Sequence, residues 1–268
     1  MSAIKSTQGI LRRPSIGMPS SVQQSSPAQQ RPIHGVNMGS PMQTRAVHFE
    51  PPENLRDLLI RASNEKTYNP KLLEELEGHL THLKNQRGQA LVSWLQLLQE
   101  NISTLKPKME NFVIALLKIA WANQDPPVVA AYRNFLANLV SAQGYYVKPV
   151  IRMLISNFIG FTDRQVVMGP SEVPSSIDQM EALVFENTHL ALRAVIDVTP
   201  LASHQAVLQY AKECLPYTMT TDTRAHTKYI ENLMKLIGYI KKDRRILLRI
   251  VIGRLVELDA HLPHQVSI

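Results

Sequence analysis

The stretch NFLANLVSAQGYYVKPVIRMLISNF, residues 134–158, reads as one helix that ends, a tight turn and a second helix that begins. Apolar residues recur at intervals of three and four on both sides of the turn, a spacing that places them on one face of a helix. They are Val128, Tyr132, Phe135, Leu136 and Leu139 before the turn, and Val147, Ile151, Leu154 and Phe158 after it. The pattern predicts a helical hairpin with an apolar stripe on each arm.

Three prolines and a glycine mark the boundaries of this hairpin. Pro126 and Pro127 open the first helix, where proline suits the first turn. Gly144 lies where a left-handed residue would end that helix. Pro149 falls in the first turn of the second helix, where its missing N–H costs little.

Similar helical hairpins are predicted to begin near residues 88, 126, 181 and 223. The steps between them are 38, 55 and 42 residues, and the longest contains an irregular loop at 160–178. HEAT and armadillo repeats have periods of roughly 40–47 residues, and each repeat must stack on its neighbour to bury its stripe. The predicted fold is all-α, with stacked antiparallel helix hairpins in a HEAT-repeat-like superhelix; a compact irregular helical bundle is the alternative.

The other hairpins show the same apolar spacing, and each run is expected to occupy one helix face. The runs are Leu91, Trp94, Leu95, Leu98, Ile102 and Leu105; Phe112, Val113, Leu116, Leu117 and Ala120; Met180, Val184, Ala191, Val195 and Val198; and, in the last pair, Ile230, Leu233, Ile237 and Ile240, then Leu247, Val251, Leu255 and Leu258.

Two domains of different character are predicted. Residues 1–52 hold seven of the 17 prolines with many Ser and Gln, so they lack the apolar surface needed to offset the entropy of ordering and are expected to be a disordered tail. The short apolar segment TRAVHFE, residues 44–50, is a local exception. Residues 53–268 are expected to form the helical-repeat domain.

The bulk composition excludes several classes of protein. A hydrophobic content of 44% suits a folded body, and no apolar run is long enough to span a membrane. The single cysteine, Cys214, excludes an internal disulfide framework. The net charge of +7 is uneven, because residues 1–50 and 221–268 each carry +4. Such patches meet nucleic acid or an acidic protein surface, or simply remain solvated.

No constellation of residues predicts an enzyme. The chain has no GxxxxGK[ST] or GxGxxG loop for phosphates. Glu77, His79 and His82 lie close together, but the histidines are three apart rather than four, so a zinc helix is not expected. Cys214 has its closest histidine, His204, ten residues away. We therefore predict no catalytic residue, metal, cofactor or small-molecule substrate.

The surface features that remain are the hairpin turns and one basic corner. Ser141 lies in the last helical turn before Gly144, and Tyr145 and Tyr146 follow in the turn itself. The run KKDRR joins the last two helices and contributes four cations, namely Lys241, Lys242, Arg244 and Arg245. The corner is a candidate contact for acidic protein or nucleic acid, or part of a nuclear-import signal; a solvated turn is the simpler interpretation.

Several of these segments resemble the RNA polymerase I initiation factor family called TIF-IA. The segments FLANLVSAQ and KPVIRMLISNF are similar to its most recognisable region, and YIENLMKLIGYIKKDRRILLRIVIGRLVELDAH to a helical pair near the middle of its chain. TRAVHFE is similar to a motif before its first helix, and LKIAWANQDPPVVAAYRNFL keeps a Trp and the following hairpin pattern. The resemblance covers most of residues 44–262.

The resemblance implies a stack of HEAT repeats and a non-enzymatic adaptor that needs no cofactor. Members of the family bind the stalk subunits of RNA polymerase I and recruit the enzyme to the promoter-bound selectivity factor in the nucleus and nucleolus. Phosphorylation of surface serines regulates this binding, which makes Ser141 the first candidate here and Ser156 the second. Members are longer, so this chain is expected to be truncated on its C-terminal side, as a gene product, an isoform or a fragment. Their acidic loop is reduced here to residues 160–178.

Two other functions remain open at this stage. A generic helical-repeat scaffold would have unrelated partners, and a nucleic-acid-binding helical protein would use the basic corner. Salt-dependent binding to duplex DNA would favour the latter, because phosphate contacts release counterions.

Overall fold

The computed structural model of the chain describes residues 55–64, 70–84, 88–160, 174–217 and 223–261. The chain divides into two compact units, residues 1–46 and 47–268, and all described residues belong to the second. The tail predicted at residues 1–52 and the segment TRAVHFE therefore lie outside the described residues.

The prediction of an all-α fold is confirmed, since the described residues contain α-helices and short 3-10 helices but no strand. The α-helices are α1 (Leu55–Asn64), α2 (Pro70–Lys84), α3 (Gln89–Glu100), α4 (Glu110–Leu117), α5 (Pro126–Ala142), α6 (Val147–Ser156), α8 (Pro174–Val198), α9 (Pro200–Glu213), α10 (Thr223–Tyr239) and α11 (Arg244–His261). The 3-10 helices are η1 (Ile102–Thr104), η2 (Pro107–Met109), η3 (Gly144–Tyr146) and η4 (Asn157–Ile159).

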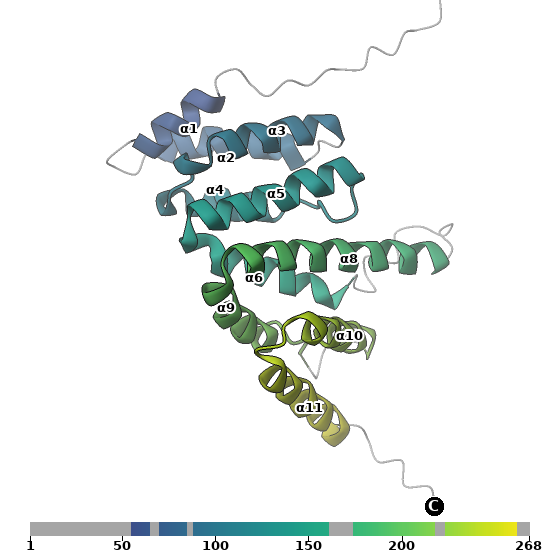
Figure 1. The fold of residues 1–268 in the computed structure, drawn as a ribbon. Helices are drawn as coiled ribbons and strands as arrows, with labels where there is room; N and C mark the ends of the chain where they lie inside the picture. Colours follow the sequence, from purple (N-terminus) through teal and green to yellow (C-terminus); the bar gives the residue numbers. More distant parts are fainter. Residues whose placement is uncertain (1–54, 65–69, 85–87, 161–173, 218–222, 262–268) are drawn as a thin grey trace, which may run out of the picture. The chain divides into compact units, whose positions relative to one another are not determined.

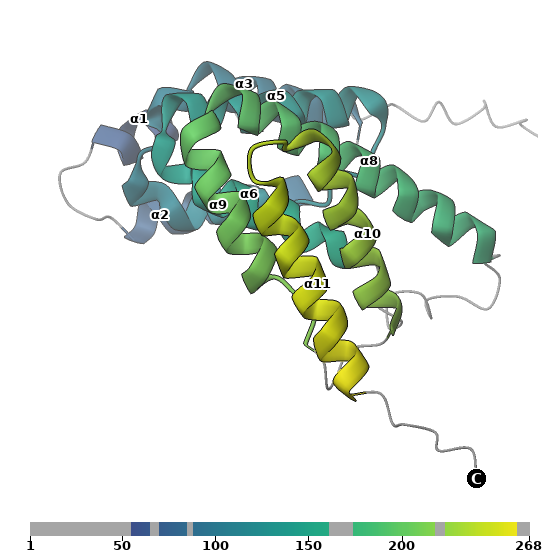
Figure 2. The same ribbon diagram turned by 60° about the horizontal axis from the view of Figure 1, so that its bottom comes forward.

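Within the second unit, the helices pack in two rows (Figure 1). Helices α3, α5 and α8 contact one another in succession, and α2, α4, α6, α9 and α11 do the same in the other row. The pairs α1–α2, α5–α6, α8–α9 and α10–α11 also contact each other, and Figure 2 shows α11 beside α10. Helix pairs therefore pack on their neighbours, while the HEAT-like superhelical twist remains a prediction.

The hairpin of residues 126–158 follows its apolar pattern closely. Val147, Ile151, Leu154 and Phe158 are all at most 2% exposed. On the other arm, Tyr132 stacks on Trp121 with ring centroids 4.9 Å apart and donates its hydroxyl to the Leu116 carbonyl at 3.0 Å. The stripe of α5 is thereby fixed against the end of α4.

The turn of this hairpin differs from the prediction. Gly144 is not a left-handed cap, because its φ is not positive. Among the described glycines, positive φ occurs at Gly88 and Gly160. Gln143 ends α5 with φ −136°, and the chain continues directly into η3. The reason is Tyr146, which is fully buried and donates its hydroxyl to the Lys106 carbonyl at 2.6 Å. Pulling this ring into the core tightens the turn without a left-handed residue.

Two of the predicted helix faces extend too far. Helix α3 ends at Glu100, so Ile102 lies in the following 3-10 helix η1 and Leu105 just after it, although Leu105 is still buried. Asn101 causes the break, because its side-chain amide donates to the Leu97 carbonyl at 2.8 Å, a local bond that competes with the helix. Ala120 lies beyond the end of α4 and is exposed.

Helix α8 differs from the prediction in two respects, its start and its buried side. It begins at Pro174, so residues 174–178 are helical rather than part of the loop predicted at 160–178, and the hairpin starts before residue 181. Residues 161–173 lie outside the described residues. Met180 and Val198 are 43% and 45% exposed, not buried. The buried side of α8 instead includes Glu181, Thr188 and His189, and the partners of Glu181 and His189 come from α10.

Leu255 of α11 also departs from the prediction, since it is 49% exposed while Leu247 and Val251 are buried. The apolar stripe of α11 is therefore covered only along its first half by α9 and α10.

Gly160 marks a close approach between the end of η4 and α8. Its φ is +79°, and a Cβ added to it would lie 2.3 Å from Glu181 Oε1 and 3.2 Å from Phe185 Cζ. Any side chain here would strain the backbone and displace the buried Glu181 carboxylate.

We expect Gly160→Ala to lower the free energy of unfolding by about 2–4 kcal/mol, combining backbone strain with overpacking. Chemical denaturation would measure the loss. Gly144→Ala is the matched control, because a Cβ there meets nothing within 4 Å, and it should change stability by less than about 0.5 kcal/mol. If both variants lost the same free energy of unfolding, the strain and close contact described for Gly160 would not explain the loss.

Candidate functional site

The residues that first suggested chemistry do not form a reactive site. No group of three His, Cys, Asp or Glu side chains is placed to hold a metal within the described part of the chain. His79 lies against the Trp94 ring, with centroids 6.3 Å apart, and the His82 side chain is outside the described residues. Burial raises the pKa of the half-buried Cys214 thiol, which makes it a poorer nucleophile. None of the described helices is both long and apolar enough to cross a membrane.

The first candidate surface is the end of the α5–α6 hairpin. Ser141 is exposed in the last turn of α5. Tyr145 is 50% exposed, and its hydroxyl donates to Glu110 Oε2 at 2.7 Å, which ties η3 to the start of α4. Its ring meets Tyr146 edge-on with centroids 5.3 Å apart. The two tyrosines thus differ in role, because Tyr146 closes the core and Tyr145 braces an exposed turn.

Ser156, the second serine candidate, is exposed at the other end of α6. Its hydroxyl donates to the Met153 carbonyl at 2.7 Å. It lines a cavity of about 360 Å³ together with Met153, Val184 and the turn that follows α4, residues 117–123. Ser141 lies in α5, before the turn into α6, and Ser156 is the last residue of α6, whose ten residues span about 15 Å at a rise of about 1.5 Å per residue. The structure does not unite Ser141 and Ser156 in one patch.

The basic corner between α10 and α11 is exposed as predicted. Lys241 and Lys242 lie in the turn after α10, and Arg244 and Arg245 begin α11. The fifth member of the run behaves differently, since Asp243 is only 7% exposed. Its Oδ2 contacts Nδ1 of His204 in α9. Its backbone carbonyl accepts hydrogen bonds from the N–H groups of Ile246 and Leu247, in the first turn of α11. Asp243 therefore anchors the corner while the cations point to solvent.

A cavity of about 540 Å³ opens beside this corner. Lys241 and Lys242 line it from the turn, Arg193 and Asp197 from α8, and His204 from α9. Arg193 lies over the Tyr239 ring, with its Cζ 4.4 Å from the ring centroid. A cation–π contact of this kind fixes the guanidinium on an aromatic face. Arg244 and Arg245 do not line the cavity.

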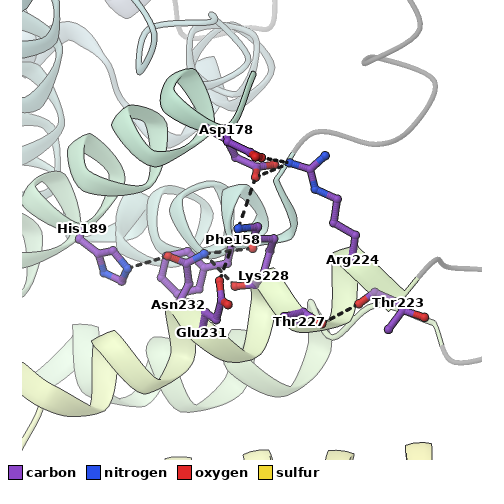
Figure 3. Close-up of polar contacts among 10 residues, drawn as sticks. Phe158, Asp178, His189, Thr223, Arg224, Thr227, Lys228, Glu231 and Asn232 are labelled. Carbon is purple, nitrogen blue, oxygen red and sulfur yellow. Dashed lines mark hydrogen bonds and ion pairs between the residues drawn. The ribbon is translucent and has the colours of Figure 1, made fainter. Parts of the chain in front are cut away.

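A chain of buried polar groups supports this cavity from behind, and Figure 3 shows its central part. Asn232 Nδ2 donates to the carbonyls of Phe158 and Lys228, at 3.3 and 2.8 Å. Its Oδ1 lies 3.0 Å from His189 Nε2, and His189 Nδ1 lies 2.8 Å from the Tyr239 hydroxyl. The chain thus connects the end of η4 through α10 and α8 to the ring beneath Arg193.

The bonding of Asn232 fixes the proton on His189. Because Asn232 Nδ2 donates twice, its Oδ1 is the acceptor, so His189 Nε2 must carry the proton. His189 Nδ1 is then unprotonated and accepts the Tyr239 hydroxyl. Burial is the main cause that lowers the pKa of His189, to about 4, and the charges of Lys235 and Arg193 lower it further. The hydrogen bond that His189 donates to Asn232 Oδ1 opposes them and raises the pKa. A neutral ring is the form that this network requires.

An ion pair crosses the same interface between α8 and α10 (Figure 3). Glu181 is 1% exposed, and its Oε2 lies 2.8 Å from Arg224 Nη2 and 3.9 Å from Lys228 Nζ. Asp178 accepts from the same Arg224 nitrogen at 3.0 Å. A buried carboxylate needs such partners, because leaving it without them costs several kcal/mol. The pair holds the start of α10 to α8.

The sequence predicted the cations of the basic corner, but it did not identify the other residues that line the cavity beside it. Arg193, Ile196 and Asp197 share one face of α8 at intervals of three and four, a signal that is visible in the sequence. Nothing in the sequence places that face near Tyr239 or the following turn, because the two segments are more than forty residues apart. His204 and Asp243 are likewise far apart in the sequence, by 39 residues.

We expect the buried neutral His189 to make stability sensitive to acid. The pKa of His189 is about 4 in the folded state, against an ordinary value of about 6.5 in the unfolded chain. Between about pH 6.5 and pH 4 the unfolded chain therefore binds a proton at this ring that the folded chain does not bind. The free energy of unfolding should therefore fall by about 3 kcal/mol through this group as the pH drops across that window. His189→Gln, which keeps a donor and an acceptor, should lose less stability over the same range.

Urea denaturation of both proteins at several pH values would compare the two slopes. Carboxylates titrate equally in both, so their contribution cancels in the difference. Identical pH slopes in the two proteins would show that His189 is protonated without penalty.

Comparison with known proteins is informative over most of the chain. Residues 53–267 match the family described as RNA polymerase I specific transcription initiation factor RRN3. The chain is 28% identical over 192 residues to the RNA polymerase I-specific transcription initiation factor RRN3 of Mus musculus, covering 68% of this chain and 29% of that protein. It is 27% identical over 177 residues to the rrn3 factor of Schizosaccharomyces pombe, covering 66% of this chain and 26% of that protein.

A third relative is the putative RRN3-like protein RRN3P2 of Homo sapiens, which is 26% identical over 190 residues, or 68% of this chain and 48% of that protein. The matched region thus spans between about a quarter and a half of the length of these relatives. No solved structure matches the chain. The match over residues 53–267 covers all described helices, and the chain belongs to the family of RNA polymerase I-specific transcription initiation factors, RRN3.

Proposed function

We propose that this chain acts in RNA polymerase I initiation as a non-enzymatic adaptor that binds the polymerase, through its stalk subunits, and brings it to the promoter-bound selectivity factor. The observation that carries the proposal is the family match over residues 53–267. An adaptor of this kind works in the nucleus, at the nucleolar ribosomal RNA genes, and needs surfaces rather than a catalytic centre or a cofactor.

The geometry that supports the proposal is the set of exposed helix ends. Helical hairpins that pack side by side bury their stripes against one another and leave their turns free for partners. Ser141 and Tyr145 lie on one such turn, with Tyr145 held in place by Glu110. Binding to an ordered turn costs less entropy than binding to a mobile one.

Phosphorylation of Ser141 is the proposed means of regulation. A phosphate adds nearly two negative charges. These charges repel an acidic partner face, and removing water from them on binding costs free energy. At the C-terminal end of α5 the helix dipole is also negative, so the added charge is unfavourable within the helix as well. Ser156 is the second candidate, and a phosphate there would obstruct the cavity that it lines.

Precipitation of the tagged chain from nuclear extract, followed by identification of the associated subunits, would test the adaptor function. Recovery of RNA polymerase I subunits supports it. Strong salt-dependent binding to duplex DNA without the polymerase would favour a nucleic-acid-binding protein instead. Recovery of neither would leave a helical scaffold with unrelated partners as the better description.

We expect Ser141→Asp to weaken association with the polymerase severalfold, because the added charge imitates the proposed phosphate only in part. The measurement is the amount of polymerase recovered with the tagged variant relative to the unchanged chain. Ser141 is exposed, so far-UV circular dichroism should show the same helicity in both.

Ser141→Asn is the matched control, with nearly the same shape as aspartate and no charge. It should recover as much polymerase as the unchanged chain. If Ser141→Asp binds equally well, this serine is not the regulated position. Loss of binding in both variants would point to the shape of the side chain rather than its charge.

A further inference from the structure

From the geometry of the α10–α11 corner we infer that its cavity is a binding site for an acidic peptide segment of a partner protein, one that carries an apolar side chain next to its carboxylates. The cavity is about 540 Å³, a volume that admits two or three side chains rather than a single ion. The relatives' names and the family match say nothing of this site.

The charges of the lining residues select the sign of the ligand. Arg193, Lys241 and Lys242 face one hollow from two separate segments, against the single carboxylate of Asp197. Arg193 is held over the Tyr239 ring, so part of the positive charge is ordered before any ligand arrives. Converging cations of this kind recognise carboxylates, and an ordered guanidinium binds one in a defined orientation.

The uncharged lining indicates a peptide rather than a nucleic acid. Ile196, Gly238 and Ile240 contribute aliphatic and backbone surface between the cations, which suits an apolar side chain. Asp197 can accept the N–H groups that a peptide backbone offers, and a phosphodiester backbone has no such donors. The Tyr239 ring is already covered by Arg193 on one face and meets His189 edge-on, so it is not arranged as a platform for base stacking.

The support behind the cavity makes it a formed site rather than a loose turn. Tyr239 is fixed through His189 and Asn232 to the Phe158 carbonyl, and the turn is fixed through Asp243 to His204. These contacts join α8, α9 and α10 around the hollow. A preformed site binds with a smaller loss of conformational entropy.

Fluorescence anisotropy with a labelled synthetic peptide of alternating Glu and Leu would test the site, using the full chain. The same peptide with Gln in place of Glu and a single-stranded oligonucleotide serve as comparison ligands. Lys241→Gln with Lys242→Gln should weaken binding of the acidic peptide on the order of tenfold, because two charge contacts are lost. Arg193→Gln, on a different helix, should weaken it severalfold.

Arg244→Gln with Arg245→Gln is the matched control, since it removes the same charge from adjacent exposed positions that do not line the cavity. The affinity of this control variant for the acidic peptide should stay within about twofold of the affinity of the unchanged chain. An equal loss in this control, equal affinity for the Gln peptide, or no binding of the acidic peptide would overturn the inference. Tighter binding of the oligonucleotide with the same dependence on Lys241, Lys242 and Arg193 would assign the site to nucleic acid instead.

The cavity would take such a segment whether or not the hairpin turn at Ser141 contacts the polymerase. Peptide binding is measured on the purified chain and polymerase recovery in nuclear extract, so the two can fail separately. If Ser141→Asp abolishes polymerase recovery while peptide binding is unchanged, the two surfaces act independently.

Discussion

Burial of each apolar helix face against the next hairpin is the constraint on which this structure depends. A two-helix hairpin has too little interior to bury its stripe, and the arms of the α5–α6 hairpin do so against neighbours on both sides: α5 against α3 and α8, and α6 against α9. The stacked rings of Trp121 and Tyr132 show how close this packing is at the α4–α5 junction. Removing a neighbour would expose apolar surface on both sides, which makes each hairpin dependent on the next.

A consequence of this packing is that polar groups enter the interior where α10 lies against α8. Helix α8 carries a buried glutamate, threonine and histidine on a side that packing forces inward. Glu181 is matched by Arg224 and Lys228, and His189 by Asn232 and Tyr239. Such contacts have strict geometry, so they determine how α10 docks on α8 where apolar contacts alone would allow sliding. The ordered position of Tyr239, and with it of Arg193, follows from this docking.

For an adaptor, the important surfaces are those that packing leaves over. Hairpins pack against one another through the sides of their helices, so the turns at their ends stay exposed. Ser141, Tyr145 and the cations of the basic corner lie at such ends. The two ends differ in character. The turn near Ser141 is held by Tyr145 and Tyr146, which donate to Glu110 and to the Lys106 carbonyl, whereas the basic corner is anchored by a buried aspartate and opens onto a cavity. An exposed turn suits contact with a broad partner surface, and a cavity suits a narrow segment.

The sequence alone determined the helical class, the boundary at Pro126, and the inward faces of the 126–158 hairpin, because proline and three-to-four apolar spacing act locally. It also located the exposed serines and the basic run. It failed at Gly144, Ala120 and Leu255, where the outcome depended on which ring or helix arrived from elsewhere in the chain. Only the tertiary structure brought Arg193 to Tyr239 and His204 to Asp243, since the packing of α8, α9 and α10 is a property of distant segments that no local spacing encodes.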